Sequence, residues 1–242
     1  MGLLDIFSGI GRAVSSCCAK IGGAVMSGIS RGMSAAVQVV GSVLSPGLRL
    51  VERAIRVVAK IVSAVAEILI EKPKEEEPEE LGMKAEVAHE QERITPEDFS
   101  SVDEYIQYIR ENIELDKERL ENINEEERAK YSVIGTGLYV KSMEENYGVI
   151  LDPEFYRAAY RLNMNAETAA RLIKAMGDNG IKHARCFEDY LLDNLVLGSS
   201  VNYDMSMVMK EVFETEDAVN SLRQSYAKYV DDQQGETGEA PE

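Results

Sequence analysis

Polar residues among the first 72 positions recur at three- and four-residue intervals, which is the spacing of one face of an α-helix. Over the second half of residues 2–44 they form one narrow stripe between apolar and small residues. That stripe consists of Ser27, Arg31, Ser34, Gln38, Ser42 and Ser45. Ser45 suits a helix N-cap and Pro46 suits a first helical position. The pattern therefore predicts a helical segment that breaks at residues 45–47 and starts again.

The second helix is predicted over residues 46–71 and has the clearest amphipathic pattern in the chain. Its polar positions are Arg49, Arg53, Arg56, Lys60, Ser63, Glu67 and Glu71. Apolar residues fill the remaining positions, so a helix here would have a broad apolar face with a cationic edge.

Small residues in the first helix are also ordered. Ala24, Gly28, Gly32 and Ala36 recur at every fourth position, an arrangement that lets two helix backbones approach closely. Nine of the eighteen glycines precede residue 48, and each costs a helix in water about 1 kcal/mol relative to alanine. A helix in this segment therefore needs a membrane or a packed partner to be stable.

The pattern changes after residue 72. Residues 73–95 are acidic and contain Pro73 and Pro78, which predicts a flexible, solvated linker. Residues 96–230 keep helical spacing throughout, with Thr95, Asp152 and Asn165 as N-cap candidates, and show no sustained alternation typical of strands. The acidic tail, residues 231–242, is predicted to be disordered. The chain is therefore predicted to be all-α, with an amphipathic arm (1–72), a linker (73–95) and an acidic helical domain (96–230).

The predicted parts of the chain differ in net charge. The chain has a formal net charge of −17. Residues 1–72 hold eight Lys/Arg and four Asp/Glu, a net charge of +4, which leaves −21 for residues 73–242. The acidic part should repel nucleic acid and anionic lipid, whereas the arm can approach them. Nucleic acid is therefore not an expected partner.

The arm is predicted to lie on a membrane rather than to cross it. Its longest run without charge, residues 32–48, is seventeen residues long and contains Pro46, while a spanning helix needs about 20 apolar residues. An interfacial amphipathic helix fits better. The expected head-group contacts are Arg31, Arg49, Arg53, Arg56 and Lys60. The expected insertion residues are Leu3, Leu4, Ile6, Phe7, Leu50, Ile55, Val58, Ile61, Val62, Val65 and Ile68.

The opening Gly2-Leu3-Leu4-Asp5-Ile6-Phe7, followed by Gly9-Ile10-Gly11, resembles the start of amphibian membrane-active peptides of the aurein and citropin kind. The resemblance covers about ten residues, and this chain lacks the paired lysines that usually follow in those peptides. It implies that this stretch can fold on a lipid surface. The alternative is a helical arm packed against protein, either within this chain or in its oligomer.

Motifs for catalysis are missing from the sequence. There is no phosphate-binding loop, dinucleotide fingerprint, nucleophile elbow or zinc-protease motif, and no cofactor or metal is expected. His183 and Cys186 share a helix face at a spacing of three, but a nucleophile and base would also need an orienting group and an oxyanion site. The three cysteines imply no disulfide framework and favour a reducing compartment for the helical domain.

The sequence therefore predicts a non-enzymatic protein with lipid as its partner and a peripheral location on a membrane, by analogy a viral penetration or structural protein or a secreted effector. Its arm would insert into lipid, and the ladder of Ala24, Gly28, Gly32 and Ala36 would bring helices together in an oligomer. The alternative function is a structural or interaction protein whose arm packs in a homo-oligomer or shell without lipid.

Overall fold

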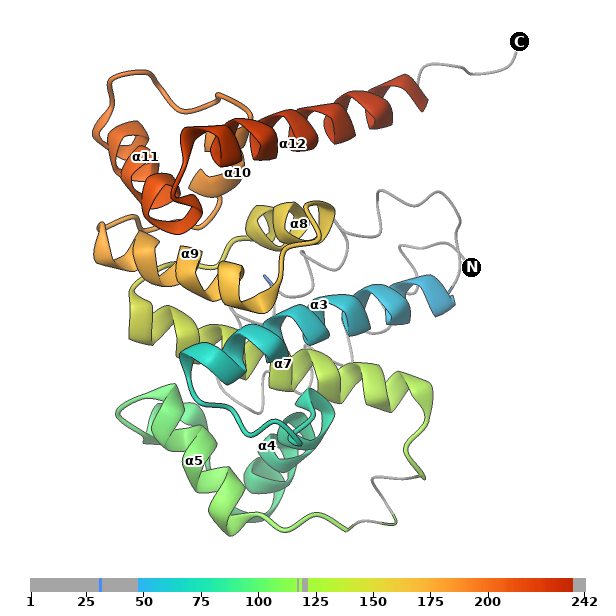
Figure 1. The fold of residues 1–242 in the computed structure, drawn as a ribbon. Coiled ribbons are helices and arrows are strands. Elements are labelled where there is room, and N and C mark those ends of the chain that lie inside the picture. The colour runs from blue at the N-terminus through green and yellow to red at the C-terminus, as the bar shows by residue number, and fades with distance from the viewer. Residues whose placement is uncertain (1–30, 32–47, 117, 119–121, 237–242) are drawn as a thin grey trace. The chain divides into compact units, whose positions relative to one another are not determined.

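A computed structural model describes residues 31, 48–116, 118 and 122–236, with side chains placed for all of these except residues 48–54 and 231–236 (Figure 1). The chain divides into two compact units, unit 1 over residues 1–146 and unit 2 over residues 147–242. The described residues form helices joined by turns and loops, and their one pairing of extended backbone is a single bridge between Ile150 and His183. The predicted all-α class is confirmed for this part of the chain.

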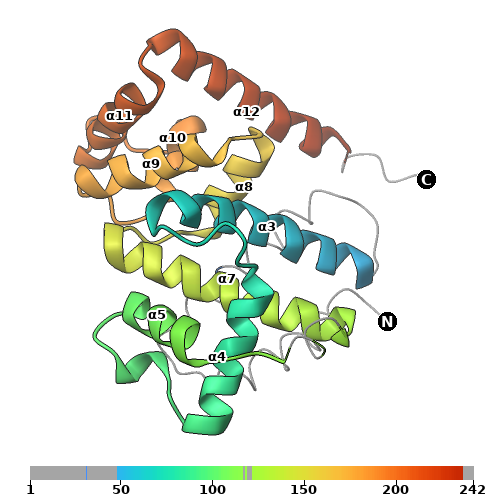
Figure 2. The same ribbon diagram turned by 60° about the horizontal axis from the view of Figure 1, so that its bottom comes forward.

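The amphipathic helix of the arm, α3 (Leu48–Leu69), has its apolar side in the core of unit 1. The side chains concerned are each 5% exposed or less: Ile55, Val58, Ala59, Val62, Val65 and Ala66. In both ribbon views α3 runs alongside α7 (Glu125–Tyr147) (Figures 1 and 2). Full burial of one such valine or isoleucine contributes roughly 1.5–3 kcal/mol, so α3 is a structural element of unit 1.

The chain reverses direction after α3 around a buried lysine. Glu71 takes a left-handed backbone conformation with φ of 51°. Lys72 is 3% exposed, and its ammonium donates hydrogen bonds to the carbonyl oxygens of Pro73 at 2.6 Å and Glu76 at 2.7 Å. A buried ammonium needs such acceptors, and these bonds fix the turn that leads into the next helix.

Residues 78–92, which the sequence analysis assigned to an extended acidic linker, form the helix α4 (Pro78–Glu92). Its side chains Leu81, Met83, Ala85 and Ala88 are 1% exposed or less. The expectation of a flexible linker is therefore wrong for this segment. The arm helix α3 also shares a unit with α4 and α7, and the boundary between the two units follows residue 146 instead of lying within residues 73–95.

Helices α4 and α7 touch backbone to backbone at two glycines. A Cβ atom added to Gly82 would lie 2.0 Å from the carbonyl oxygen of Tyr131, and one added to Gly135 would lie 1.9 Å from that of Pro78. Both distances are far below a van der Waals contact. The glycines therefore set how closely these two helices approach.

The rest of unit 1 consists of the short 3-10 helix η1 (Pro96–Asp98) and the helix α5 (Val102–Asn112), which packs on α4. The predicted cap at Thr95 is present, because the Thr95 backbone N–H donates to Asp98 at 2.8 Å. Ser101 caps α5 by accepting a hydrogen bond from the Glu104 N–H. Tyr105, Ile106 and Ile109 form the buried side of α5.

Unit 2 contains five described helices around an aromatic core. They are α8 (Pro153–Arg161), α9 (Ala166–Asp178), α10 (Cys186–Leu191), α11 (Ser200–Phe213) and α12 (Glu216–Glu236). Phe155, Tyr156, Phe187 and Tyr226 are each 1% exposed or less. α11 packs on α9 and α12, while α10 contacts α8, α11 and α12. The predicted disorder from residue 231 is wrong for residues 231–236, which continue α12.

Among the helices of the described residues, none combines the length and apolar content needed to cross a bilayer.

The two contact glycines predict a loss of stability when either is given a side chain. Gly82→Ala and Gly135→Ala should each lower the free energy of unfolding by about 3 kcal/mol, the upper end of the usual range for overpacking, because backbone atoms must move apart to admit the methyl group. Urea unfolding followed by circular dichroism measures this. The control Glu126→Ala, at an exposed position of α7, should change it by less than about 0.5 kcal/mol. Equal effects from all three variants would contradict the close approach.

Candidate functional site

Large apolar side chains are exposed together on unit 2. Of the eight that are exposed in the described part of the chain, five fall between residues 196 and 207: Val196, Leu197, Val201, Tyr203 and Met207. Leu197 is 90% exposed, Val196 75% and Tyr203 67%. We call these five residues the apolar patch. Several large apolar side chains exposed within one short segment indicate a candidate interaction site.

Helix α11 is apolar on two sides, which explains how the patch arises. Met205, Val208, Met209 and Val212 face the core of unit 2 and are 5% exposed or less. Tyr203 and Met207 lie one helical turn apart and are exposed. A helix that is apolar on both sides normally has both sides covered. Tyr203 and Met207 on the outer side of α11 are therefore not covered by the described residues of unit 2.

The patch adjoins two hollows that share a wall. The first has a volume of about 330 Å³ and lies between α10, α11 and α12, where Met207, Lys210, Glu216 and Arg223 contribute to its lining. The second has a volume of about 580 Å³ and is lined by Leu197, Asn202 and other residues of this region. Tyr190, Ser206 and Arg223 line both. We call the two hollows together the α11 groove.

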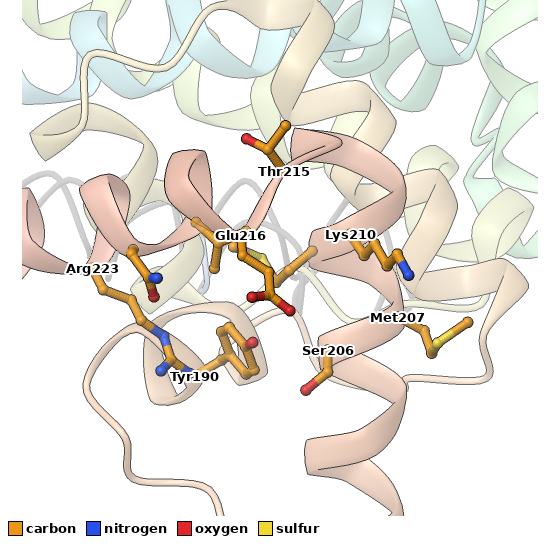
Figure 3. A pocket seen from close by; sticks show the side chains of 10 residues that line it. Tyr190, Ser206, Met207, Lys210, Thr215, Glu216 and Arg223 are labelled. Carbon is orange, nitrogen blue, oxygen red and sulfur yellow. The ribbon is translucent and has the colours of Figure 1, made fainter.

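Arg223 and Tyr190, which both line the first hollow, form a cation–π pair. The Arg223 guanidinium lies 4.1 Å from the centroid of the Tyr190 ring and 3.0 Å from the Asp193 carboxylate. Figure 3 shows the side chains of Tyr190, Ser206 and Glu216 turned toward the same space, with Arg223 beside Tyr190. Arg223 Nε is buried and has no hydrogen-bond acceptor among the described residues. The groove thus combines apolar walls with a few polar groups, as binding sites do.

Acidic residues surround the groove. Between residues 189 and 223 the chain has seven Asp/Glu and two Lys/Arg. Glu211, Glu214, Glu216 and Asp217 are exposed around the end of α11 and the start of α12. The field at this surface is therefore negative and favours a partner of positive charge.

A buried carboxylate positions the helices that form the groove. Glu188 on α10 is 4% exposed and accepts hydrogen bonds from Arg157 of α8 and Tyr226 of α12, with Arg157 Nε at 2.9 Å. Burial and the bond to Glu188 raise the pKa of Tyr226 to about 12, so the phenol remains a donor. This contact ties Tyr190 on α10 and Arg223 on α12 to one scaffold.

Two similar carboxylate clusters occur in unit 1. Glu76 accepts hydrogen bonds from Arg110 at 2.8 and 2.6 Å and from the Tyr139 hydroxyl at 2.5 Å. Glu86 accepts from Lys130 at 2.9 and 3.0 Å and from the Tyr131 hydroxyl at 2.6 Å. Both carboxylates already have a cation and a phenol as partners. That arrangement suits charge neutralisation in a core better than acid–base catalysis on a substrate.

The structure buries some of the residues that were predicted to contact lipid and exposes others. Ile55, Val58, Val62 and Val65 are buried in unit 1, Ile61 is half-buried, and Ile68 is 48% exposed. Arg56 and Lys60 are exposed, and Arg56 lies 3.7 Å from Glu125. Insertion of the buried set into lipid would require α3 to leave the core of unit 1. The structure brings Arg56 and Lys60 to the surface and buries six of the described apolar residues of α3 in the protein.

Arg31, a predicted head-group contact, is paired inside the protein. Its guanidinium donates a hydrogen bond to Glu144 of α7, whose side chain is 5% exposed. The other residues of the arm that were predicted to contact lipid or another helix lie outside the described side chains. They are Leu3, Leu4, Ile6, Phe7, Ala24, Gly28, Gly32, Ala36, Arg49, Leu50 and Arg53.

His183 and Cys186 do not form a nucleophile and base. His183 Nδ1 lies 3.3 Å from Asp152, whose carboxylate also accepts the Arg185 N–H instead of capping α8. The Cys186 backbone N–H donates a hydrogen bond to the His183 carbonyl oxygen at 3.2 Å, but among the described residues their side chains form no hydrogen bond with each other. Burial and the nearby Asp189 raise the pKa of the Cys186 thiol, which disfavours the thiolate. Among the described residues there is also no group of three or more metal-ligating side chains.

Sequence reasoning missed the apolar patch. One signal was available: Met205, Met207 and Met209 alternate along a helix, so they point to more than one side of it. Methionine is frequent at adaptable binding surfaces. The exposure of Val196 and Leu197 could not be found in this way, because apolar residues next to a helix usually belong to the core.

Comparison of the chain with family models, with curated proteins and with solved structures found no match.

The cluster around Glu76 predicts a stability loss that depends on pH. Burial alone would raise the pKa of Glu76, but hydrogen bonds from Arg110 and Tyr139 and the charges of Arg110 and Lys72 lower it below its ordinary value of 4.5. The folded protein therefore gains stability from Glu76 above pH 4.5 and loses it as the pH falls through the lower, folded-state pKa. Arg110→Met should cost about 3–5 kcal/mol at pH 7, because it leaves a buried carboxylate without its cation.

In Arg110→Met the pKa of Glu76 should instead lie above its value in the unfolded chain. Protonation then favours folding, and the deficit relative to the natural protein should shrink between pH 7 and pH 4. Urea unfolding at the two pH values measures this. Arg128→Met, which removes an exposed arginine of α7, serves as the control. A deficit that is equal at both pH values would rule out the assigned coupling.

Proposed function

We propose that this chain is a non-catalytic interaction protein that presents the apolar patch and the α11 groove to another protein. The exposure of Val196, Leu197, Val201, Tyr203 and Met207 beside a lined groove carries this proposal. Unit 2 supplies the docking surface, and unit 1 forms a second helical scaffold that includes α3. The alternative predicted from the sequence was an interaction protein whose N-terminal arm packs in a homo-oligomer or shell, whereas the surface proposed here lies on unit 2.

Two observations support protein packing over lipid insertion for α3. Its apolar side is buried in unit 1, and withdrawing Val58, Val62 and Val65 into a bilayer would expose the apolar surface that they cover. Arg31 is bound to the buried Glu144, so this part of the arm also meets protein. Both observations favour an arm that packs against protein.

The chemistry of the groove supports binding without a reaction. Arg223 is held by Tyr190 and Asp193, and Glu188 behind them by Arg157 and Tyr226. These pairs fix side chains in place and leave no described group that combines a lowered nucleophile pKa with an adjacent base. A rigid, partly apolar groove of this kind suits recognition of a partner surface.

The proposal predicts that the patch serves binding and not stability. Leu197→Ser and Tyr203→Ser should change the free energy of unfolding by less than about 0.5 kcal/mol, since both side chains are mostly in solvent. The same variants should reduce binding of an apolar fluorescent dye to the folded protein. Tyr160→Ser, at a 44% exposed position in α8, is the matched control and should leave dye binding unchanged. A loss of stability above about 2 kcal/mol would make the patch structural and refute the proposal.

Membrane contact is a second candidate function, favoured by the exposed cations Arg56 and Lys60 on α3 and by the apolar sequence of residues 2–44. Here α3 stays in unit 1 and only its cationic edge meets anionic head groups, while the preceding residues insert. Each such cation near the surface is worth about 1 kcal/mol.

This second candidate predicts that the double variant Arg56→Gln, Lys60→Gln binds anionic vesicles roughly 30-fold more weakly, a difference of about 2 kcal/mol. Flotation of the full chain with vesicles of phosphatidylserine and phosphatidylcholine measures it. The double variant Lys174→Gln, Lys228→Gln removes two exposed cations from unit 2 and is the control. If the natural chain fails to float, or both double variants float like it, α3 does not contact head groups.

A further inference from the structure

We propose that the α11 groove and apolar patch bind residues 2–30 from a second copy of this chain as an amphipathic helix. The inference rests on the proposed function and names its partner. It follows from three observations: the uncovered apolar side of α11, the acidic surroundings of the groove, and the sequence pattern of the N-terminal segment.

The segment carries the anchors that a helix needs to lie in an apolar groove. From Leu3 onward, five apolar residues and one cysteine recur at alternating steps of four and three residues. They are Leu3, Phe7, Ile10, Val14, Cys17 and Ile21. Helices that dock into grooves present such a single stripe at i, i+4 and i+7. At 3.6 residues per turn Asp5 and Arg12 fall on the opposite side of the helix, and Lys20 falls on its flank.

The same segment is poorly suited to being a helix by itself. Six glycines lie between residues 2 and 30, and each disfavours the helical state in water. Helix formation by this segment therefore has to be coupled to burial of its apolar stripe. The α11 groove, whose lining includes the exposed Met207 and Leu197, offers this burial.

Charge favours this occupant over an acidic partner. Residues 2–30 contain Arg12 and Lys20 against the single acid Asp5, a net charge of +1. The region that forms the groove, residues 189–223, has seven acids against two cations. Opposite net charges speed the encounter and suppress wrong partners. Residues 73–146 and 147–242 are each acidic, so residues 1–72 are the cationic part that a second copy can offer.

Among the residues that the structure describes, none covers the patch, and a second copy of the chain is the partner that we infer. Leu197 is 90% exposed and Val196 75% exposed in the single chain. Each copy would then contribute one segment and one groove, which are different surfaces. Such a head-to-tail contact propagates from copy to copy and closes into a ring or extends as a filament.

Photo-crosslinking of the full chain tests the occupant directly. Tyr203 is replaced by p-benzoylphenylalanine, and unlabelled and ¹⁵N-labelled copies are mixed before irradiation. We expect cross-links between position 203 and residues 2–30. Mass spectrometry should show that some of them join an unlabelled chain to a ¹⁵N-labelled chain. The same photoreactive residue in place of Tyr160, an exposed position of α8, should give no cross-links to residues 2–30.

Sedimentation of full-chain variants provides a second, independent test. The double variant Leu197→Glu, Met207→Glu should weaken self-association at least tenfold, because it places charge in the apolar contact. Phe7→Glu with Ile10→Glu should have the same effect from the other side of the contact. Tyr160→Glu is the control for the groove. Ser8→Glu, which lies off the apolar stripe, is the control for the segment.

The outcomes separate the occupant from the docking function. If the groove variant weakens self-association but the Phe7 and Ile10 variant does not, or if position 203 cross-links to another part of a second copy, the occupant is wrong and the docking surface stands. If cross-links to residues 2–30 join only identical labels, the second copy is excluded. If position 203 yields no protein cross-links and the groove variant behaves like Tyr160→Glu, the docking function fails as well.

Discussion

Burial of carboxylates is the constraint around which both units are built. Glu76, Glu86 and Glu188 each lie in a core, and each accepts hydrogen bonds from one cation and one tyrosine hydroxyl. A buried carboxylate without partners would cost several kcal/mol. The cation and the phenol always come from other segments, so each cluster joins helices that are distant in sequence. Glu188 alone fixes α8, α10 and α12, and with them Tyr190 and Arg223 in the α11 groove.

The same clusters explain which part of the fold the sequence predicts and which it does not. Apolar spacing predicts the helix over 46–71 and the helical character of residues 96–230, because a helix needs only a local pattern. The acidic run around Glu76 and Glu79 predicts an extended linker, since such runs are usually solvated. It fails because Arg110 neutralises Glu76, and the Tyr139 hydroxyl donates a hydrogen bond to it, from more than thirty residues away. No local pattern carries that information.

Amphipathicity has the same limit for function. The stripe of Arg56 and Lys60 on α3 correctly implies that Val58 and Val62 lie together on the other side, but it does not say what covers them. Lipid and protein impose the same spacing. In unit 1 the cover is protein. The predicted head-group residue Arg31 likewise meets Glu144, because a guanidinium suits a buried carboxylate as well as a phosphate.

Helices α3 and α11 show why exposure, and not pattern, locates the candidate site. α3 has the stronger amphipathic sequence, yet most of its apolar residues are already satisfied within unit 1. α11 has a weaker pattern because it is apolar on two sides, and only one side is needed for the core of unit 2. Its outer residues Tyr203 and Met207 stay in solvent at a cost in free energy. A helix that keeps apolar residues where its own fold does not use them is the element from which binding is best inferred.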